Sequence, residues 1–217
     1  MEKINIRFIS RLAKCAAIAL CSLAFFFPFA KTHAAATLQT LRPSSNNLGL
    51  VGFWSLDGTD VTTSVIDRSG QGNNGGFYNA ATSSVKTVGK IGQAMTFDGV
   101  DDFIKIPDSS LYDNTTTLTV SIWMKASVAD ATTSFPMLSK TRSVSGFAGW
   151  ILYRDSSEKI IFYLHDGSTS RSVASTNTFA DKLWHHVVGV YNGTDARLYI
   201  DGVLAATPGA FTSALQD

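Results

Sequence analysis

Apolar and polar residues alternate along TLTVSIWMKAS, residues 117–127, and this alternation limits the fold more than any other feature of the chain. Positions 118, 120, 122 and 124 carry Leu, Val, Ile and Met, whereas the positions between them carry Thr119, Ser121, Trp123 and Lys125. A period of two is that of a β-strand with one face in a core and the other in wetter surroundings. The segment therefore predicts a half-buried strand.

Similar short runs recur along the chain and are separated by turn residues. We expect further strands at 50–56, 93–99, 102–106, 135–141, 148–155, 159–166, 183–192, 196–202 and 203–207. The segment DRSGQGNNGG (67–76) is predicted to be a loop, because Gly and Asn favour turns. No helical period of useful length appears after residue 36. Many short strands with frequent turn signals predict an all-β sandwich or jelly roll.

The N-terminus has the pattern of a secretory signal peptide. Residues 1–14 contain four basic side chains, residues 15–30 are apolar and uncharged, and THAAA (32–36) offers small residues for cleavage after Ala34 or Ala36. A membrane span needs ~20 apolar residues, so this shorter run predicts no span in the mature chain. We expect a signal peptide at 1–34, a linker or leading arm at 35–47, and a secreted, cell-surface or periplasmic protein. An uncleaved anchor remains the alternative.

Loss of residues 1–34 changes the composition on which the folded domain depends. It removes five of the 18 basic residues and one of the 17 acidic residues, which leaves a net charge of −3. A basic face for nucleic acid is therefore not supported. Cys15 and Cys21 leave with the leader, so the exported domain has no disulfide and must be stabilised by its core, or by its core and a bound ion.

Two adjacent histidines stand in WHHVVGVYNG, residues 184–193. In a strand, His185 and His186 point to opposite faces and cannot bind one metal ion together. His186 shares a face with Val188, and His185 shares the other face with Tyr191. The favoured interpretation is one packed, hydrogen-bonded histidine and one surface histidine, with acid/base catalysis by either as the alternative.

Five blocks in this order resemble the laminin-G-like jelly rolls of the concanavalin A-like lectin/glucanase superfamily, over about residues 48–207. The blocks are GLVGFWSLDG, the loop from Asp67 to Gly75, the segment from Gly89 to Ile106, TVSIWMK, and the stretch from Trp184 to Gly202. The resemblance implies a two-sheet antiparallel jelly-roll sandwich at 48–217, with the tryptophan–histidine strand as scaffold. Relatives end with a closing strand that carries an acidic pair followed by Arg and Tyr. Nothing similar occurs in TPGAFTSALQD (207–217), so we expect an incomplete domain that lacks its last strands.

Catalysis by this domain is not expected. Retaining glucanases of this fold need two carboxyl groups ~5–5.5 Å apart, which related enzymes place on one short strand. The chain without its leader has one glutamate, Glu158, and most aspartates stand in turns such as LDG, FDG and IDG. No nucleophile elbow, zinc-binding helix or phosphate-binding loop is present.

The favoured function is therefore a secreted, non-catalytic recognition module for a carbohydrate, a glycoconjugate or a surface protein. The alternatives are the N-terminal accessory module of a larger secreted glycosidase or adhesin, and a structural module without a small ligand. Aromatic side chains are natural platforms for sugars. Trp150 and Tyr153, beside the SGFAG loop, are the candidate ligand-binding residues.

A structural calcium ion is predicted near the loops at 67–75 and 98–102. Calcium takes 6–8 oxygen ligands from carboxylates, amides and backbone carbonyls. Suitable side chains on these loops are those of Asp67, Asn73, Asp98, Asp101 and Asp102, and we expect Asp98, Asp101 and Asn73 to be the ligands. The alternative is that Asp98, Gly99 and Asp101 make an ordinary hairpin turn.

Overall fold

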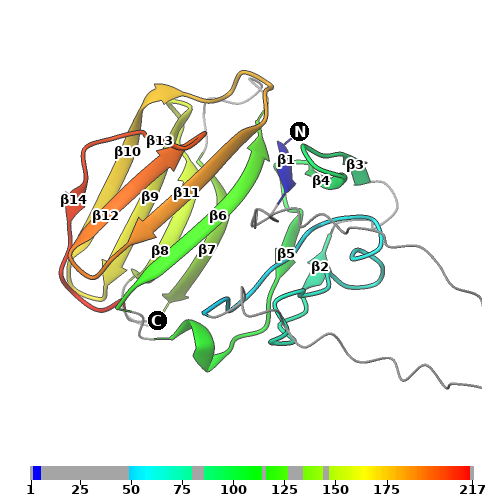
Figure 1. Ribbon diagram of the computed structural model, residues 1–217, viewed down its shortest axis with the longest axis horizontal. Coiled ribbons are helices and arrows are strands. Elements are labelled where there is room, and N and C mark those ends of the chain that lie inside the picture. The colour runs from blue at the N-terminus through cyan, green and yellow to red at the C-terminus, as the bar shows by residue number, and fades with distance from the viewer. Residues whose placement is uncertain are drawn as a thin grey trace, which may run out of the picture. The chain divides into compact units, whose positions relative to one another are not determined.

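Figure 1 shows the computed structural model of the chain, which describes residues 2–5, 49–79, 86–113, 116–126, 134–143 and 147–215. These residues belong to one compact unit, Met1–Phe8 with Gly49–Asp217. The predicted linker at 35–47 and all of the predicted signal peptide except residues 2–5 lie outside the described residues. Among the described residues, no helix has the length and apolar character to cross a membrane.

The described part is built from antiparallel β-sheets, as the alternation predicts. The larger sheet has the order β13-β12-β11-β6-β1-β4-β3, with β14 beside β12. Its strands are β1 (Glu2–Asn5), β3 (Lys86–Val88), β4 (Gln93–Phe97), β6 (Leu118–Lys125), β11 (His185–Tyr191), β12 (Asp195–Ile200), β13 (Val203–Leu204) and β14 (Gly209–Ala210). A second sheet, β10-β9-β8-β7, consists of β7 (Phe135–Ser143), β8 (Phe147–Arg154), β9 (Lys159–Asp166) and β10 (Ser170–Thr178).

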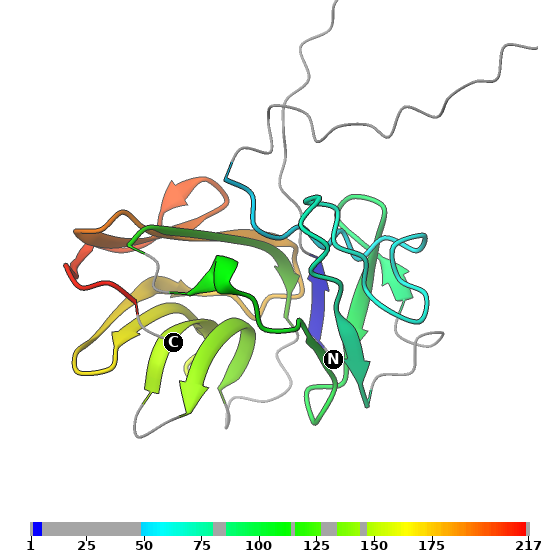
Figure 2. The same ribbon diagram turned by 90° about the horizontal axis from the view of Figure 1, so that it is seen from below.

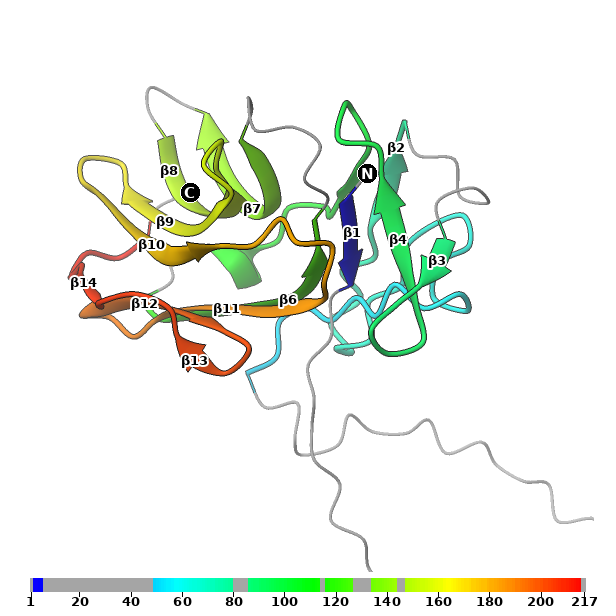
Figure 3. The same cartoon turned by 90° about the horizontal axis from the view of Figure 1, so that it is seen from above.

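The main core lies between these two sheets, which appear as separate layers in Figures 2 and 3. The even-numbered positions of β6 face this core, as expected: Ile122 is fully buried and Met124 is 3% exposed. The second sheet contributes Phe162 and Leu164, both fully buried. Burial of such side chains stabilises a fold by ~1.5–3 kcal/mol each. The two-sheet sandwich is therefore held together by this shared core, and the described residues contain no cysteine.

The sequence did not predict β10. Its nine residues, SRSVASTNT, are mostly small and polar, and only Val173 and Ser175 are buried. The strand forms because its backbone pairs with β9, from Ser170 opposite His165 to Thr178 opposite Lys159. Hydrogen bonds to a neighbouring strand do not require apolar side chains, so this strand left no periodic signal.

The prediction of a regular strand at 50–56 was wrong. In this segment only Trp54 makes a β-bridge, opposite Asp67. The backbone N–H of Phe53 instead donates to the Asp67 carboxylate at 3.0 Å, and the Phe53 carbonyl accepts from the N–H of Arg68 at 2.7 Å. The backbone groups of Phe53 thus form hydrogen bonds with the 67–75 loop and not with a neighbouring strand.

A small third sheet pairs β2 (Gly76–Tyr78) with β5 (Phe103–Lys105). Phe77 and Ile104 lie opposite each other and pack against a second core cluster, formed by Leu56, Val61, Val65, Met95 and Phe97. Because β5 pairs with β2, the turn that follows β4 does not join a hairpin. Residues 98–102 do form the turn between β4 and β5 that the alternative describes, but the two strands do not pair with each other as a hairpin.

Strand β1 lies between β4 and β6 in the larger sheet. Its Ile4 is opposite Met95 on one side and opposite Met124 on the other. These methionines belong to the two different core clusters, so β1 joins the parts of the sheet that carry them. Cleavage of the predicted signal peptide would remove β1 from this position.

Candidate functional site

The turn between β4 and β5, residues 98–102, is organised by aspartate side chains. The Asp98 carboxylate accepts the backbone N–H of Val100 at 2.8 Å and that of Asp101 at 3.3 Å. The Asp102 carboxylate accepts the N–H of Asp98 at 3.2 Å. Gly99 has a φ of 77°, in the left-handed region that glycine tolerates. The hydrogen bond from Val100, ahead of the others, lowers the pKa of Asp98 below its ordinary value.

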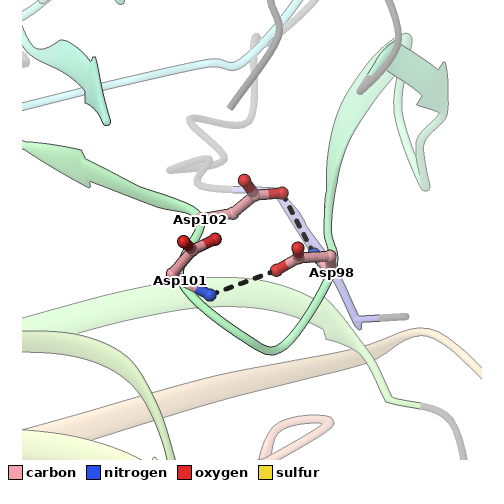
Figure 4. A group of neighbouring side chains, drawn as sticks. All are labelled: Asp98, Asp101 and Asp102. Carbon is pink, nitrogen blue, oxygen red and sulfur yellow. Dashed lines mark hydrogen bonds between the residues drawn. The ribbon is translucent and has the colours of Figure 1, made fainter. Parts of the chain in front are cut away.

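These contacts bring three carboxylates together at the surface (Figure 4). One oxygen from each of Asp98, Asp101 and Asp102 lies within 4.8 Å of the other two, and this is the one group of three potential metal ligands among the described residues. Asp98 and Asp101 were expected in this group. Asp102 was among the available oxygen donors in the sequence but not among the three preferred ligands, because sequence spacing alone does not show that two adjacent aspartates can both reach one point.

The oxygen atoms of this turn are of the type that binds a hard cation, but they are too few to fill its coordination shell. Among the described residues, the hydrogen bonds of the turn use Asp98 Oδ1 and Asp102 Oδ2, which leaves the other oxygen of each and both oxygens of Asp101 for a ligand. Four carboxylate oxygens fall short of the six to eight that calcium takes, so water or a bound hydroxyl would have to complete the shell. The chemistry suits calcium or magnesium, whereas a zinc site would normally contain nitrogen or sulfur ligands.

Asn73 lies outside this group, and its hydrogen bonds stabilise the 67–75 loop. The side-chain amide of Asn73 donates to the Val51 backbone carbonyl at 2.9 Å, and the backbone carbonyl of Asn73 accepts from the indole N–H of Trp54 at 2.8 Å. The backbone N–H of Asn73 donates to Asp67 at 2.9 Å. The structure therefore ties Asn73 to the segment 51–54 by two contacts and to Asp67 by a third, and it does not place Asn73 with the three aspartates.

Asp67 is the centre of that loop and is 8% exposed. Its carboxylate accepts backbone N–H groups from Phe53, Ser69 and Asn73 and the hydroxyl of Ser69, at 2.8–3.0 Å. Burial raises its pKa, but these hydrogen bonds outweigh burial and hold the pKa below the ordinary value. The conformation of the glycine- and asparagine-rich segment is thus stabilised by hydrogen bonds to one carboxylate.

Trp150 and Tyr153, the sequence candidates for ligand contact, lie on opposite faces of β8, because they are three positions apart on a strand. Trp150 packs against the main core cluster. Tyr153 is half-buried on the other face, and burial, followed by the nearby charge of Asp155, raises its pKa. The structure does not bring these two side chains to one surface.

The two histidines occupy opposite faces of β11, as predicted. His185 is 9% exposed, and its ring nitrogens contact Asp201 at 2.7 Å and Asp181 at 3.1 Å. Burial lowers the pKa of His185, but these two carboxylates outweigh burial and raise it. On the other face, His186 Nε2 lies 2.7 Å from the Ser121 hydroxyl, and its ring stacks on Trp123 with centroids 5.0 Å apart. Burial lowers the pKa of His186.

The histidine contacts explain why this strand is part of the scaffold. Asp201 binds the ring of His185 through one oxygen and accepts the backbone N–H of His186 through the other, at 2.9 Å. One carboxylate at the β12–β13 turn therefore ties that turn to the start of β11. Ser121 and His186 form a serine–histidine pair. Among the described residues, no carboxylate bonds to the other ring nitrogen of His186, so the pair lacks the third member of a hydrolytic triad.

The fold and these contacts define an antiparallel β-sandwich with an acidic turn at its surface. Residues 98–217 match the laminin-G group described as the concanavalin A-like lectin/glucanases superfamily, and the chain belongs to this family. The resemblance noted in the sequence is thereby confirmed. Among curated protein sequences, none is significantly similar to this chain.

Two of the solved structures that match this chain do so at low sequence identity. One is residues 221–444 of an S-layer domain-containing protein from Clostridium thermocellum, with 22% identity, a TM-score of 0.40, and coverage of 70% of this chain and 67% of that one. The other is domain 4 of AbnA, an extracellular arabinanase from Geobacillus stearothermophilus, in complex with arabinotriose. It has 16% identity, a TM-score of 0.43, and coverage of 76% of this chain and 77% of that one.

Proposed function

We propose that this protein is an exported recognition module that binds extracellular carbohydrate, without modifying it, through the surface around the 98–102 turn. The observation that carries the proposal is the gathering of the Asp98, Asp101 and Asp102 carboxylates within 4.8 Å of one another at the surface. Membership of a lectin/glucanase superfamily is consistent with a carbohydrate ligand. Fold alone does not establish function, so the proposal depends on the chemistry of the turn.

The chemistry of the turn suits hydroxyl-rich ligands. A carboxylate oxygen accepts hydrogen bonds from two neighbouring sugar hydroxyls, and charge-assisted bonds of this kind are about twice as strong as neutral ones. The Asp98 side chain is already held by two backbone N–H groups, so little conformational entropy remains to be lost on binding. A calcium ion held by the three carboxylates would add a second way to bind hydroxyl oxygens.

The same turn is poorly suited to glycoside hydrolysis. A general acid needs a carboxyl group whose pKa is raised, usually by burial in apolar surroundings. Asp98 and Asp101 are exposed, and the pKa of Asp98 is lowered by its hydrogen bonds. Asp98 is therefore ionised at neutral pH and cannot donate a proton to a leaving group. This favours binding over catalysis.

The function can be tested by incubating the purified protein with insoluble polysaccharides. We expect saturable retention on at least one of them and no release of soluble sugar above a protein-free blank. Release of sugar that is lost in a Glu158→Gln or Asp101→Asn variant would overturn the non-catalytic proposal. Failure to bind any carbohydrate in a broad glycan array would overturn the carbohydrate proposal.

Calcium is predicted to raise the thermal midpoint of the protein. A ligand at 100 times its Kd stabilises the native state by about 2.7 kcal/mol, which corresponds to ~5–10 °C for a domain of this size. Asp101→Asn should abolish the shift, because it removes a carboxylate that makes none of the hydrogen bonds of the turn. Asp155→Asn is the matched control, since Asp155 accepts two backbone N–H groups in a different turn. Equal midpoints in calcium and in chelator would rule out the ion.

A further inference from the structure

The ring of His185 lies between two carboxylates that belong to different loops. Its Nδ1 is 2.7 Å from Asp201 in the β12–β13 turn, and its Nε2 is 3.1 Å from both oxygens of Asp181. Asp181 belongs to the β10–β11 connection, residues 179–184. Phe179 of this connection packs edge-on against the ring, with centroids 5.0 Å apart. The imidazole therefore bridges the β10–β11 connection and the β12–β13 turn.

Both hydrogen bonds of the ring form at once only when the ring is doubly protonated. An ionised carboxylate accepts hydrogen bonds and has none to donate, so each ring nitrogen must carry its own proton. A neutral imidazole has one N–H and satisfies one of the two carboxylates. Histidine is the side chain that ordinarily titrates between about pH 5 and 8. The number of segments that His185 holds thus changes with the charge of its ring.

Asp201 is better placed than Asp181 to keep the proton of a neutral ring. Its contact with the ring is shorter, and its other oxygen is fixed by the backbone N–H of His186 at 2.9 Å. Asp181 also accepts the backbone N–H of Leu183 at 2.9 Å, which lies in the same connection. Loss of the Nε2 proton therefore frees the β10–β11 connection from the ring and leaves the β12–β13 turn attached.

The β10–β11 connection covers part of the main core. Phe179 packs against the main core cluster, and Ala180 is 5% exposed. Among the described residues, two backbone hydrogen bonds tie the connection to other elements, from Phe179 to the Glu158 carbonyl and from Lys182 to the Ala126 carbonyl. Segments with few such ties open locally at low free energy. The contact between the His185 ring and the connection is thus a large share of what holds it closed.

We propose that His185 is a pH-sensitive switch, which holds the β10–β11 connection on the core when its ring is charged and releases the connection when its ring is neutral. The inference goes beyond the proposed function and does not depend on a ligand. Burial lowers the pKa of His185, but the two carboxylates outweigh burial and raise the pKa above its ordinary value. Stabilisation by the switch is therefore complete below the unfolded pKa of ~6.5 and is lost as the pH rises through the folded pKa.

The other ionisable side chains of the neighbouring elements do not contact the His185 ring. They are those of Lys125 in β6, Asp155, Glu158 and Lys159 around the β8–β9 turn, Lys182 in the connection, and His186 on the opposite face of β11. Among the described residues, the hydrogen bonds and ion pairs of the ring go to Asp181 and Asp201 alone. Burial lowers the pKa of His186, so His186 titrates in the opposite sense.

The test is amide hydrogen exchange of the full chain at about pH 5.5 and about pH 8.5, with rates corrected for the intrinsic effect of pH. Protection of the β10–β11 connection should fall at least fivefold at the higher pH, whereas protection of β9 should stay within about twofold. His185→Gln, which cannot carry a charge, should show the lower protection at both pH values. His186→Gln is the matched control on the same strand and should keep the response of the unchanged chain.

Equal protection of the connection at both pH values in the unchanged chain would overturn the switch. A response that persists in His185→Gln, or that is absent from His186→Gln, would assign the pH dependence to another group and overturn it as well. NMR titration of the His185 ring in the unchanged chain decides the case in which His185→Gln does not fold. A ring midpoint above about 6.5 that coincides with the loss of protection supports the switch, and a midpoint at or below this value contradicts it.

Discussion

Replacing Asp67 by Asn is expected to lower the free energy of unfolding by about 3 kcal/mol, because hydrogen bonds to a charged group contribute ~1.5–3 kcal/mol and unsatisfied buried donors cost ~1–3 kcal/mol each. The Asp67 carboxylate accepts three backbone N–H groups and one hydroxyl in a nearly closed environment. An amide of the same shape turns a donor toward these donors. Chemical denaturation at pH 7 measures the loss.

The effect of Asp67→Asn depends on pH in a defined direction. The folded pKa of Asp67 is lowered, so its ionised form stabilises the protein above the unfolded value of ~3.9, and this contribution is lost as the pH falls through the folded pKa. The difference between Asp67→Asn and the unchanged protein should therefore be full at pH 7 and shrink below pH ~4. Asp108→Asn, a control at a side chain that is 84% exposed, should change stability by less than about 0.5 kcal/mol. A pH-independent loss for Asp67→Asn would contradict the role of its charge.

Replacing Gly149 by Ala is expected to destabilise the protein by about 3 kcal/mol or more, because backbone strain and a steric clash act together. Gly149 lies within β8 with a φ of 112°, and an added Cβ would lie 2.1 Å from the backbone carbonyl oxygen of Lys140 on the paired strand. A backbone atom in a strand ladder cannot rotate away as a flexible side chain can. Thermal melting should show a midpoint lower by ~6–12 °C or no cooperative transition.

Gly202→Ala is the matched control for Gly149→Ala. Gly202 also has a positive φ, of 83°, but no atom lies within 4 Å of the position that a Cβ would occupy. It should cost only the conformational strain of about 1 kcal/mol. Similar midpoints for the two variants would show that the contact with Lys140 relaxes and would contradict the clash.

Strands with strong alternation could be predicted from the sequence, whereas those defined by pairing alone could not. The segment around Ile122 and the β11 segment showed a period of two because one face of each is buried in the shared core. β10 lacks this pattern, since only Val173 and Ser175 of its side chains are buried. The segment 50–56 showed apolar residues without a regular strand, because its backbone groups bond to the Asp67 loop.

The residues of the candidate site also fall into those that the sequence could predict and those that depend on long-range contacts. The aspartates of the 98–102 turn could be chosen from residue type, because carboxylates close in sequence are held near one another by a tight turn. The exclusion of Asn73 depends on long-range contacts with Val51 and Trp54, which are 22 and 19 residues away. Outside this site, Tyr78 and Phe103, whose rings stack, are separated along the chain by β3 and β4 and lie opposite each other only through the β2–β5 pairing.

The sequence by itself determined the fold class, the family, the opposite faces of His185 and His186, and two of the three clustered carboxylates, since each follows from local periodicity or from motif order. Tertiary structure decided that β5 pairs with β2, that Asp67 collects four donors, and that two aromatic rings stack in water. These features depend on which distant backbone segments hydrogen-bond to one another. Which segments pair depends on the burial and strand pairing of the whole chain, so it cannot be predicted from a short stretch of residues.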